Sequence, residues 1–179
     1  MRQERIKVQF LLDDNNDEFP RLFLKENCFV FKKANTQEKI IPFDSINGVK
    51  ISVVNRIYNP SVGFLKDGVR GFMSHINAGK FSIYFNYYID LDIYTNQVNY
   101  LFESYDLEEA AEFVLKLENN FTIVDDLHLL DLFKTKSFNE AREYIDNNYR
   151  YWAKQFNLEN PRTTLDTSMT EMVQRKIKK

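Results

Sequence analysis

The fold is decided by residues 81–93, FSIYFNYYIDLDI, which alternate between apolar and polar side chains over their whole length. Large apolar side chains occupy every odd position from Phe81 to Ile93, and the even positions carry Ser82, Asn86, Asp90 and Asp92 together with two tyrosines. A period of two places the two sets on opposite faces of a β-strand. We therefore expect one long strand, or two joined by a turn near Asn86, with one face in the core and the other in water.

Shorter strands are expected on both sides of this one. Before it, strand-forming residues and alternation indicate strands within residues 5–12, 22–33, 39–43 and 46–54. After it, residues 95–97 predict a hairpin turn into a strand that includes Val98 and Phe102. Because the connections are too short for helical crossovers, we expect a mostly antiparallel sheet.

Residues 55–79 interrupt the pattern. They contain four of the five glycines of the chain, including Gly63, Gly68 and Gly71, with Pro60 beside them. This composition indicates a long loop or an irregular edge strand. We interpret it as a mobile or functional segment.

The period changes to that of a helix at Asp106. Asp106 and Glu109 have the spacing of a capping box, and the apolar residues that follow predict a helix to about Asn119. A second helix is expected after Thr122, with Asp125 and Asp126 near its positive end.

A third helix is expected over residues 137–157, where Ser137 and Glu140 form a second capping-box pattern. Its apolar seam consists of Phe138, Ala141, Ile145, Tyr149, Trp152 and Phe156. Residues 162–167 indicate a linker before a short C-terminal helix. We divide the chain into a β-domain with its capping helix (1–120), a helical extension (121–160) and a linker with a basic tail (161–179).

Composition excludes several classes of protein. The chain of 179 residues has a formal net charge of −2, and residues 61–120 are its acidic third with four basic and nine acidic groups. A nucleic-acid-binding domain usually has a basic excess, so we expect no nucleic-acid partner. The single Cys28 excludes an internal disulfide, and the polar N-terminal region does not resemble a signal peptide. We expect a cytoplasmic protein.

Motifs for catalysis or metal binding are weak. Asp13, Asn15 and Asp17 alternate like the start of a calcium loop, but the glycine and glutamate that such a loop needs are missing. His75, His128 and Cys28 do not form a recognisable nucleophile–base pattern. We therefore predict no catalytic residue, no metal site and no cofactor.

The even face of strand 81–93 contains the remaining candidates. Asp90 and Asp92 point the same way, and alternation favours a solvated surface over a catalytic pair. Tyr84 and Tyr88 share that face but lack the basic groove that base stacking requires. We favour a site covered by helix 137–157 over a direct protein contact, because the seam of this helix needs a partner surface.

The order of short strands and a capping helix resembles the pleckstrin-homology-like superfold, in particular bacterial PH-like domains. The resemblance rests on residues 24–33 (LKENCFVFKK), residues 39–51 (KIIPFDSINGVKI), the hairpin 91–103 and the helix 106–119. It implies an α+β fold: a bent antiparallel barrel capped by a helix, here followed by two to three additional helices. It also implies binding rather than catalysis.

Two binding modes follow from the resemblance. Members that hold phosphoinositides place basic residues in the first hairpin, where this chain has Lys32, Lys33 and Lys39, but the basic-x-Arg element is absent. We expect a non-enzymatic adaptor for a protein partner or a second copy of the chain. Its candidate surface consists of Tyr84, Tyr88, Asp90, Asp92, Gly63, Gly68 and Gly71. The alternative is peripheral binding to anionic lipids through the three lysines and the tail residues Arg175, Lys176, Lys178 and Lys179.

Overall fold

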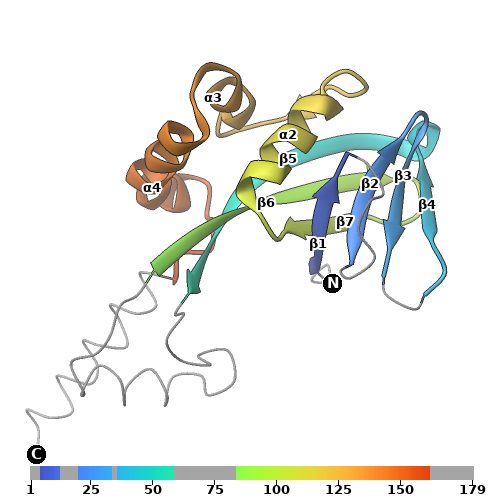
Figure 1. Cartoon of the computed structure of the whole chain (residues 1–179), viewed down its shortest axis with the longest axis horizontal. Helices are drawn as coiled ribbons and strands as arrows, with labels where there is room; N and C mark the ends of the chain where they lie inside the picture. The colour runs from blue at the N-terminus through green and yellow to red at the C-terminus, as the bar shows by residue number, and fades with distance from the viewer. Residues whose placement is uncertain (1–4, 13–19, 34–35, 59–83, 162–179) are drawn as a thin grey trace, which may run out of the picture.

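The computed structural model of the chain describes residues 5–12, 20–33, 36–58 and 84–161. These residues form an α+β fold with one eight-stranded mixed sheet and three α-helices (Figure 1). The strands are β1 (Arg5–Leu11), β2 (Arg21–Lys25), β3 (Cys28–Lys32), β4 (Lys39–Pro42), β5 (Ile46–Tyr58), β6 (Tyr84–Thr95), β7 (Tyr100–Ser104) and β8 (Ile123–Val124). The helices are α2 (Leu107–Leu117), α3 (Leu129–Thr135) and α4 (Phe138–Gln155), and a 3₁₀ turn, η1 (Phe43–Ser45), joins β4 to β5.

The long alternating strand is confirmed as β6, which is continuous through Asn86. It pairs with β5 in an antiparallel register from Tyr58 opposite Tyr84 to Ile46 opposite Thr95, with one irregularity beside Gly48. Its odd residues from Tyr87 to Ile93 are buried, and Ile89, Leu91 and Ile93 are fully inaccessible. Residues 81–83 of the predicted strand lie outside the described residues.

The sheet is mixed, so the prediction of a mostly antiparallel sheet holds in part: four of the seven strand pairings are antiparallel and three are parallel. Its order is β4-β3-β2-β1-β7-β6-β5-β8, and β1 is parallel to both of its neighbours, while β8 is parallel to β5. Alternation reports the face of each residue but not the direction of its strand. Because the order has two ends, the expected closed barrel and PH-like fold are not confirmed.

Two strand boundaries also differ from the prediction. Residues 22–33 form two strands rather than one, with a tight turn at Glu26 and Asn27 that places Lys25 opposite Cys28. Strand β5 continues to Tyr58, so residues 55–58 are strand rather than loop. The rest of the glycine-rich segment, including Gly63, Gly68 and Gly71, lies outside the described residues.

Helix α2 closes one face of the sheet over the core (Figure 1). Asp106 caps it as predicted, because its carboxylate accepts hydrogen bonds from the backbone N–H groups of Glu108 and Glu109 at 2.8 and 3.0 Å. Its buried Phe113 packs 5.0 Å from the ring of Phe10 in β1. The helix therefore packs on both β1 and β6.

The second helix begins later than predicted. Ile123 and Val124 form β8, which pairs with β5, and α3 starts only at Leu129 after His128 adopts a left-handed conformation with φ of 56°. The predicted acid at its positive end is nevertheless present, since Asp125 accepts from the backbone N–H of Leu130 at 2.8 Å. Strand pairing overrode the helical pattern at residues 123–124.

Helix α4 matches the third prediction closely. The capping box is present, with the Ser137 N–H and hydroxyl both donating to the Glu140 carboxylate at 2.9 and 2.6 Å. Within the seam, Ala141, Ile145, Tyr149 and Trp152 are buried, while Phe138 is half-buried and Phe156 is exposed. The ring of Tyr149 lies 5.3 Å from that of Tyr87 in β6, so α4 packs against the odd face of that strand.

Candidate functional site

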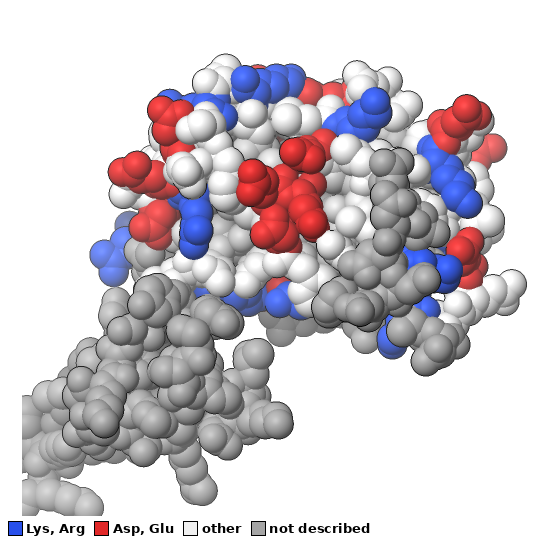
Figure 2. Space-filling view, viewed as in Figure 1, with Lys and Arg blue, Asp and Glu red and all other residues white. Residues whose placement is uncertain are grey.

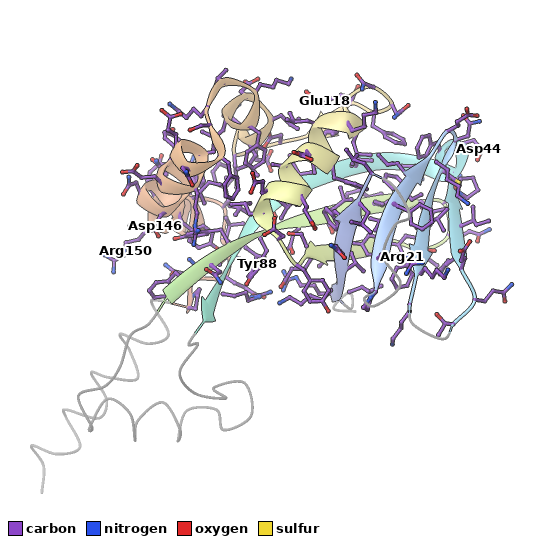
Figure 3. All side chains as sticks on the ribbon, viewed as in Figure 1. Arg21, Asp44, Tyr88, Glu118, Asp146 and Arg150 are labelled. Atoms are coloured by element: carbon purple, nitrogen blue, oxygen red, sulfur yellow. The ribbon has the colours of Figure 1, made fainter. Side chains whose placement is uncertain are left out.

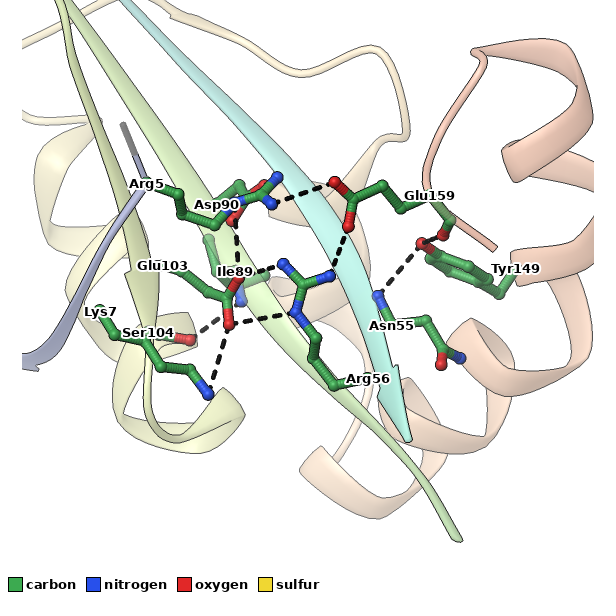
Figure 4. A network of polar contacts seen from close by, with 10 residues as sticks. All are labelled: Arg5, Lys7, Asn55, Arg56, Ile89, Asp90, Glu103, Ser104, Tyr149 and Glu159. Atoms are coloured by element: carbon green, nitrogen blue, oxygen red, sulfur yellow. Dashed lines mark hydrogen bonds and ion pairs between the residues drawn. The ribbon is translucent and has the colours of Figure 1, made fainter. Parts of the chain in front are cut away.

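A network of charged side chains lies on one face of the central strands, and we call it the polar face. It consists of Arg5 and Lys7 of β1, Arg56 of β5, Asp90 of β6 and Glu103 of β7, joined by Glu159 after α4 (Figure 4). Along each strand these residues alternate with core residues such as Val8, Ile89 and Phe102. The period of two therefore places the network on the face opposite the core.

Glu103 is the centre of the network, although only 2% of its surface is exposed. Its carboxylate pairs with Nη2 of Arg56 at 2.5 Å, and with Nε of Arg5 and Nζ of Lys7 at 3.4 Å each. A buried carboxylate is costly unless it is paired and hydrogen-bonded, and three cations meet that condition here. The arrangement holds β1, β5 and β7 together through one side chain.

Asp90 corrects the expectation of a solvated even face. It is 6% exposed and pairs with Nη2 of Arg5 at 2.7 Å. Burial raises the pKa of Asp90 to about 6, against the charge and hydrogen bond of Arg5, which lower it. Its neighbour Asp92 is half-buried, and burial raises its pKa as well. A face that alternation alone assigned to solvent is thus withdrawn from water at Asp90 and in part at Asp92.

Glu159 connects the helical extension to this network. Its two carboxylate oxygens bond to Nη1 of Arg5 at 3.2 Å and to Nη1 of Arg56 at 2.5 Å. The hydrogen bond from Arg56 lowers the pKa of Glu159, partial burial opposes that effect, and the hydrogen bond and charge of Arg5 lower it further. Burial lowers the pKa of the Arg56 guanidinium, but Glu103 and Glu159 outweigh burial and raise it above its ordinary value. Each partner thus stabilises the charge of the other.

The turn after α4 explains how Glu159 reaches the sheet. Asn157 takes a left-handed conformation with φ of 54°, and the N–H of Leu158 bonds to the carbonyl of Ala153 at 3.0 Å. This is the Schellman pattern for ending a helix, in which asparagine is one of the residues that tolerate positive φ. The hydroxyl of Tyr149 then donates to the backbone carbonyl of Glu159 at 2.6 Å.

Of the predicted tyrosines, only Tyr88 is described with its side chain. It projects from β6 (Figure 3), and Nζ of Lys7 lies 4.8 Å from the centre of its ring. Helix α4 contacts Tyr87, whose hydroxyl donates to Asp146, while Phe138 and Arg142 of the same helix line a small pocket with Tyr88. The expected cover of this face by helix 137–157 stays a prediction. For Tyr84, the structure gives the backbone pairing with Tyr58 only.

The three candidate lipid-binding lysines do not form one patch. Lys39 pairs opposite Phe31, so it shares the face of Phe31, and its Nζ lies 4.7 Å from the ring centre of Tyr100. Lys32 follows Phe31 in β3 and points to the other face, where it pairs with Glu38 at 3.4 Å. Lys33 is exposed just after β3.

The other predicted residues either lie away from the network or fall outside the residues that the structure describes. Cys28 is half-buried at the start of β3, and His128 precedes α3. His75, the acidic run 13–18 and the tail residues Arg175, Lys176, Lys178 and Lys179 lie outside the described residues. In the part of the chain that is described, no group of three or more His, Cys, Asp or Glu side chains has a geometry that could hold a metal ion.

A second candidate surface is the groove between α3 and α4. It has a volume of about 420 Å³, and its lining includes Asp131, Tyr144, Trp152 and Phe156. The rings of Tyr144 and Trp152 lie 6.0 Å apart, and Tyr144 is 44% exposed. Tyr151, one helical repeat of seven residues beyond Tyr144, is 64% exposed on the same helix. The apolar pattern of residues 137–157 predicts the seam of α4 but not the exposed aromatic side chains Tyr144 and Tyr151.

The helical side of the molecule is acidic. Residues 106–161 contain twelve acidic and six basic side chains. Figure 2 shows acidic side chains gathered over α2, where Glu108, Glu109 and Glu112 are exposed. Asp126 and Asp131 extend this charge to the rim of the groove, although Asp126 pairs with Lys50 at 2.6 Å. A ligand of this surface meets a negative potential.

Comparisons with protein-family models, with curated proteins and with solved structures found no match to this chain. Among the described helices, none is both long enough and apolar enough to cross a membrane.

Proposed function

We propose that this protein is a non-enzymatic binding module that docks a protein partner in the groove between α3 and α4. The observation that carries the proposal is that two exposed aromatic side chains, Tyr144 of α4 and Phe156 just after it, line that groove, with the exposed Tyr151 seven residues beyond Tyr144 on the same helix. Aromatic residues are enriched in the energetically important centres of protein interfaces. The resemblance to PH-like domains supports binding as well, since that superfold serves mainly in recognition.

The groove favours an amphipathic segment as its ligand. Trp152 and Tyr144 offer ring surface to apolar side chains, and about 420 Å³ accommodates a few of them rather than a whole domain. The acidic surroundings favour a partner with Lys or Arg beside those apolar residues, because complementary charge directs association and suppresses wrong partners. The partner is either another protein or a second copy of this chain.

Site-specific photo-crosslinking tests the proposal. A photoreactive phenylalanine analogue placed at position 151 should give one discrete adduct in the native host, which mass spectrometry identifies. The control places the same analogue at Val98, which is also exposed but lies in the hairpin between β6 and β7. Sedimentation velocity over a concentration series shows whether the adduct is a self-association.

The affinity for the identified partner is then measured with variants that lack aromatic side chains of α4. Tyr144→Ser and Tyr151→Ser together should weaken binding by about tenfold or more, since truncating an aromatic anchor typically costs 1–2 kcal/mol or more. Val98→Ser is the matched control and should leave the affinity unchanged. Equal labelling from positions 151 and 98, or binding that survives both serine substitutions, would show that the groove is not the docking surface.

A further inference from the structure

Two arginines on the polar face converge on one carboxylate. Arg5 and Arg56 come from β1 and β5, which are separated in the sheet by β7 and β6. Nη1 of each guanidinium is directed at Glu159, one at each carboxylate oxygen, at 3.2 and 2.5 Å (Figure 4). The two groups therefore form a fork that grips an oxyanion from both sides.

The fork is positioned by acids that are independent of Glu159. Asp90 and Glu103, both almost fully buried on the intervening strands, hold the other nitrogens of the two guanidiniums. Removing the Glu159 side chain leaves these contacts in place. The arginines are thus preorganised by the sheet, which lowers the cost of ordering them around a ligand.

The balance of charges in the network shows that the two arginines require an anion between them. With Glu159 in place, Arg5, Lys7 and Arg56 are balanced by Asp90, Glu103 and Glu159. Without it, three cations face two directly paired acids among the described residues, and these five groups carry an excess positive charge. Glu159 is itself 44% exposed, whereas the two supporting acids are buried, so the solvent side of the fork is the side that Glu159 covers.

We propose that the Arg5–Arg56 fork is a binding site for the carboxylate or phosphate group of a soluble ligand, and that Glu159 occupies it as an intramolecular competitor. Guanidinium pairs match the oxygen geometry of both groups, and charge-assisted hydrogen bonds are the strong ones. A tethered competitor acts at an effective concentration on the order of millimolar, so an outside ligand has to displace it. This site is separate from the α3–α4 groove and does not rest on the proposed function.

Removing the competitor tests the proposal. The variant Glu159→Ala is compared with wild type by NMR titration and calorimetry with inorganic phosphate and with acetate, at constant ionic strength against chloride. We expect Glu159→Ala to bind phosphate at least about tenfold more tightly than wild type does, with the largest shifts near positions 5 and 56. Phosphate should also raise the melting temperature of Glu159→Ala more than that of wild type.

The matched control is Glu143→Ala, which removes an exposed acid of α4 and changes the net charge equally. It should behave as wild type. Arg5→Lys in the Glu159→Ala background keeps a cation beside Asp90 but removes the fork, and it should lose most of the gained affinity. If Arg56→Gln also folds, it should abolish phosphate binding.

Three results would overturn the proposal. The first is equal phosphate affinity in Glu159→Ala, Glu143→Ala and wild type. The second is a Glu159→Ala variant that is destabilised but gains nothing from phosphate over chloride, which would make Glu159 a latch for the C-terminal segment only. The third is binding to vesicles that contain phosphatidic acid without any response to glycerol 3-phosphate, which would assign the fork to a membrane surface rather than to a soluble ligand.

Discussion

The hydroxyl of Tyr149 accepts a hydrogen bond from the backbone N–H of Asn55 at 3.1 Å, 94 residues away in the sequence. The same hydroxyl donates to the carbonyl of Glu159 at 2.6 Å. At Asn55 the outer edge of β5 is beyond its short pairing with β8, which involves only Val49 and Lys50. One phenol therefore completes the edge of the sheet and fixes the segment that follows α4.

Replacing Tyr149 with Phe removes both hydrogen bonds while keeping the ring that packs on Tyr87. The buried N–H of Asn55 then lacks a partner, and leaving such a group unsatisfied costs about 1–3 kcal/mol. We expect the free energy of unfolding, measured by urea denaturation, to fall by that amount. Tyr151→Phe is the control on an exposed ring of the same helix and should change stability by less than about 0.5 kcal/mol.

The side chain of Asn55 predicts a change in the opposite direction. It is fully buried, and neither its Nδ2 nor its Oδ1 has a hydrogen-bond partner among the described residues. An apolar side chain of similar size avoids the cost of a buried, unsatisfied amide. We expect Asn55→Leu to raise the free energy of unfolding by about 1–2 kcal/mol. A loss of stability in Asn55→Leu would mean that the amide is satisfied in solution, by an ordered water for example.

The cap of α2 gives a test of local structure. The Asp106 carboxylate accepts from two backbone N–H groups, so Asp106→Ala should lower the free energy of unfolding by about 1 kcal/mol. Asp106→Ser retains a capping oxygen and should recover most of that loss. Chemical denaturation of the three proteins gives the comparison, and an alanine variant as stable as wild type would show that the cap contributes nothing.

Local patterns predicted local structure well. The alternation of residues 84–95 and the caps at Asp106 and Ser137 depend on neighbours a few residues apart, and all three are present. The parallel pairing of β1 with β2 and β7 depends on where a strand enters the sheet, which alternation does not report. Residues 123–124 became a strand because β5 offered them a free edge, again a non-local cause.

The polar network was beyond sequence reasoning for the same reason. Arg5 and Glu159 are 154 residues apart and have no spacing that marks them as partners. Alternation did place Asp90 on the face opposite the core, but we expected that face to be exposed to water. The available signals were the two basic residues on either side of Ile6 in β1, Arg5 and Lys7, and an asparagine just after the last turn of α4. The first marks the polar face, and the second marks the turn that returns Glu159 to it.

The buried Asp90 predicts an unusual dependence of stability on pH. Its ordinary pKa is 3.8, and burial raises the folded-state pKa to about 6, so between these values the folded protein binds more protons than the unfolded chain does. Stability then falls as pH rises through that window, by about 3 kcal/mol in total at 1.36 kcal/mol per unit. Glu159 acts oppositely, because its pKa is lowered and its contribution is lost as pH falls below its ordinary value of 4.5.

Urea denaturation between about pH 5 and about pH 7 lies above the window in which Glu159 titrates. Comparison with Asp90→Asn in this range separates the contribution of Asp90 from that of Asp92, whose pKa is also raised. Wild type should lose stability as pH rises across it, and Asp90→Asn should show a flatter profile because the group that titrates is gone. Asp131→Asn removes an exposed acid of α3 and should keep the wild-type slope. If Asp90→Asn and wild type have the same slope, the Asp90 carboxylate is already ionised at pH 5, and its pairing with Arg5 outweighs its burial.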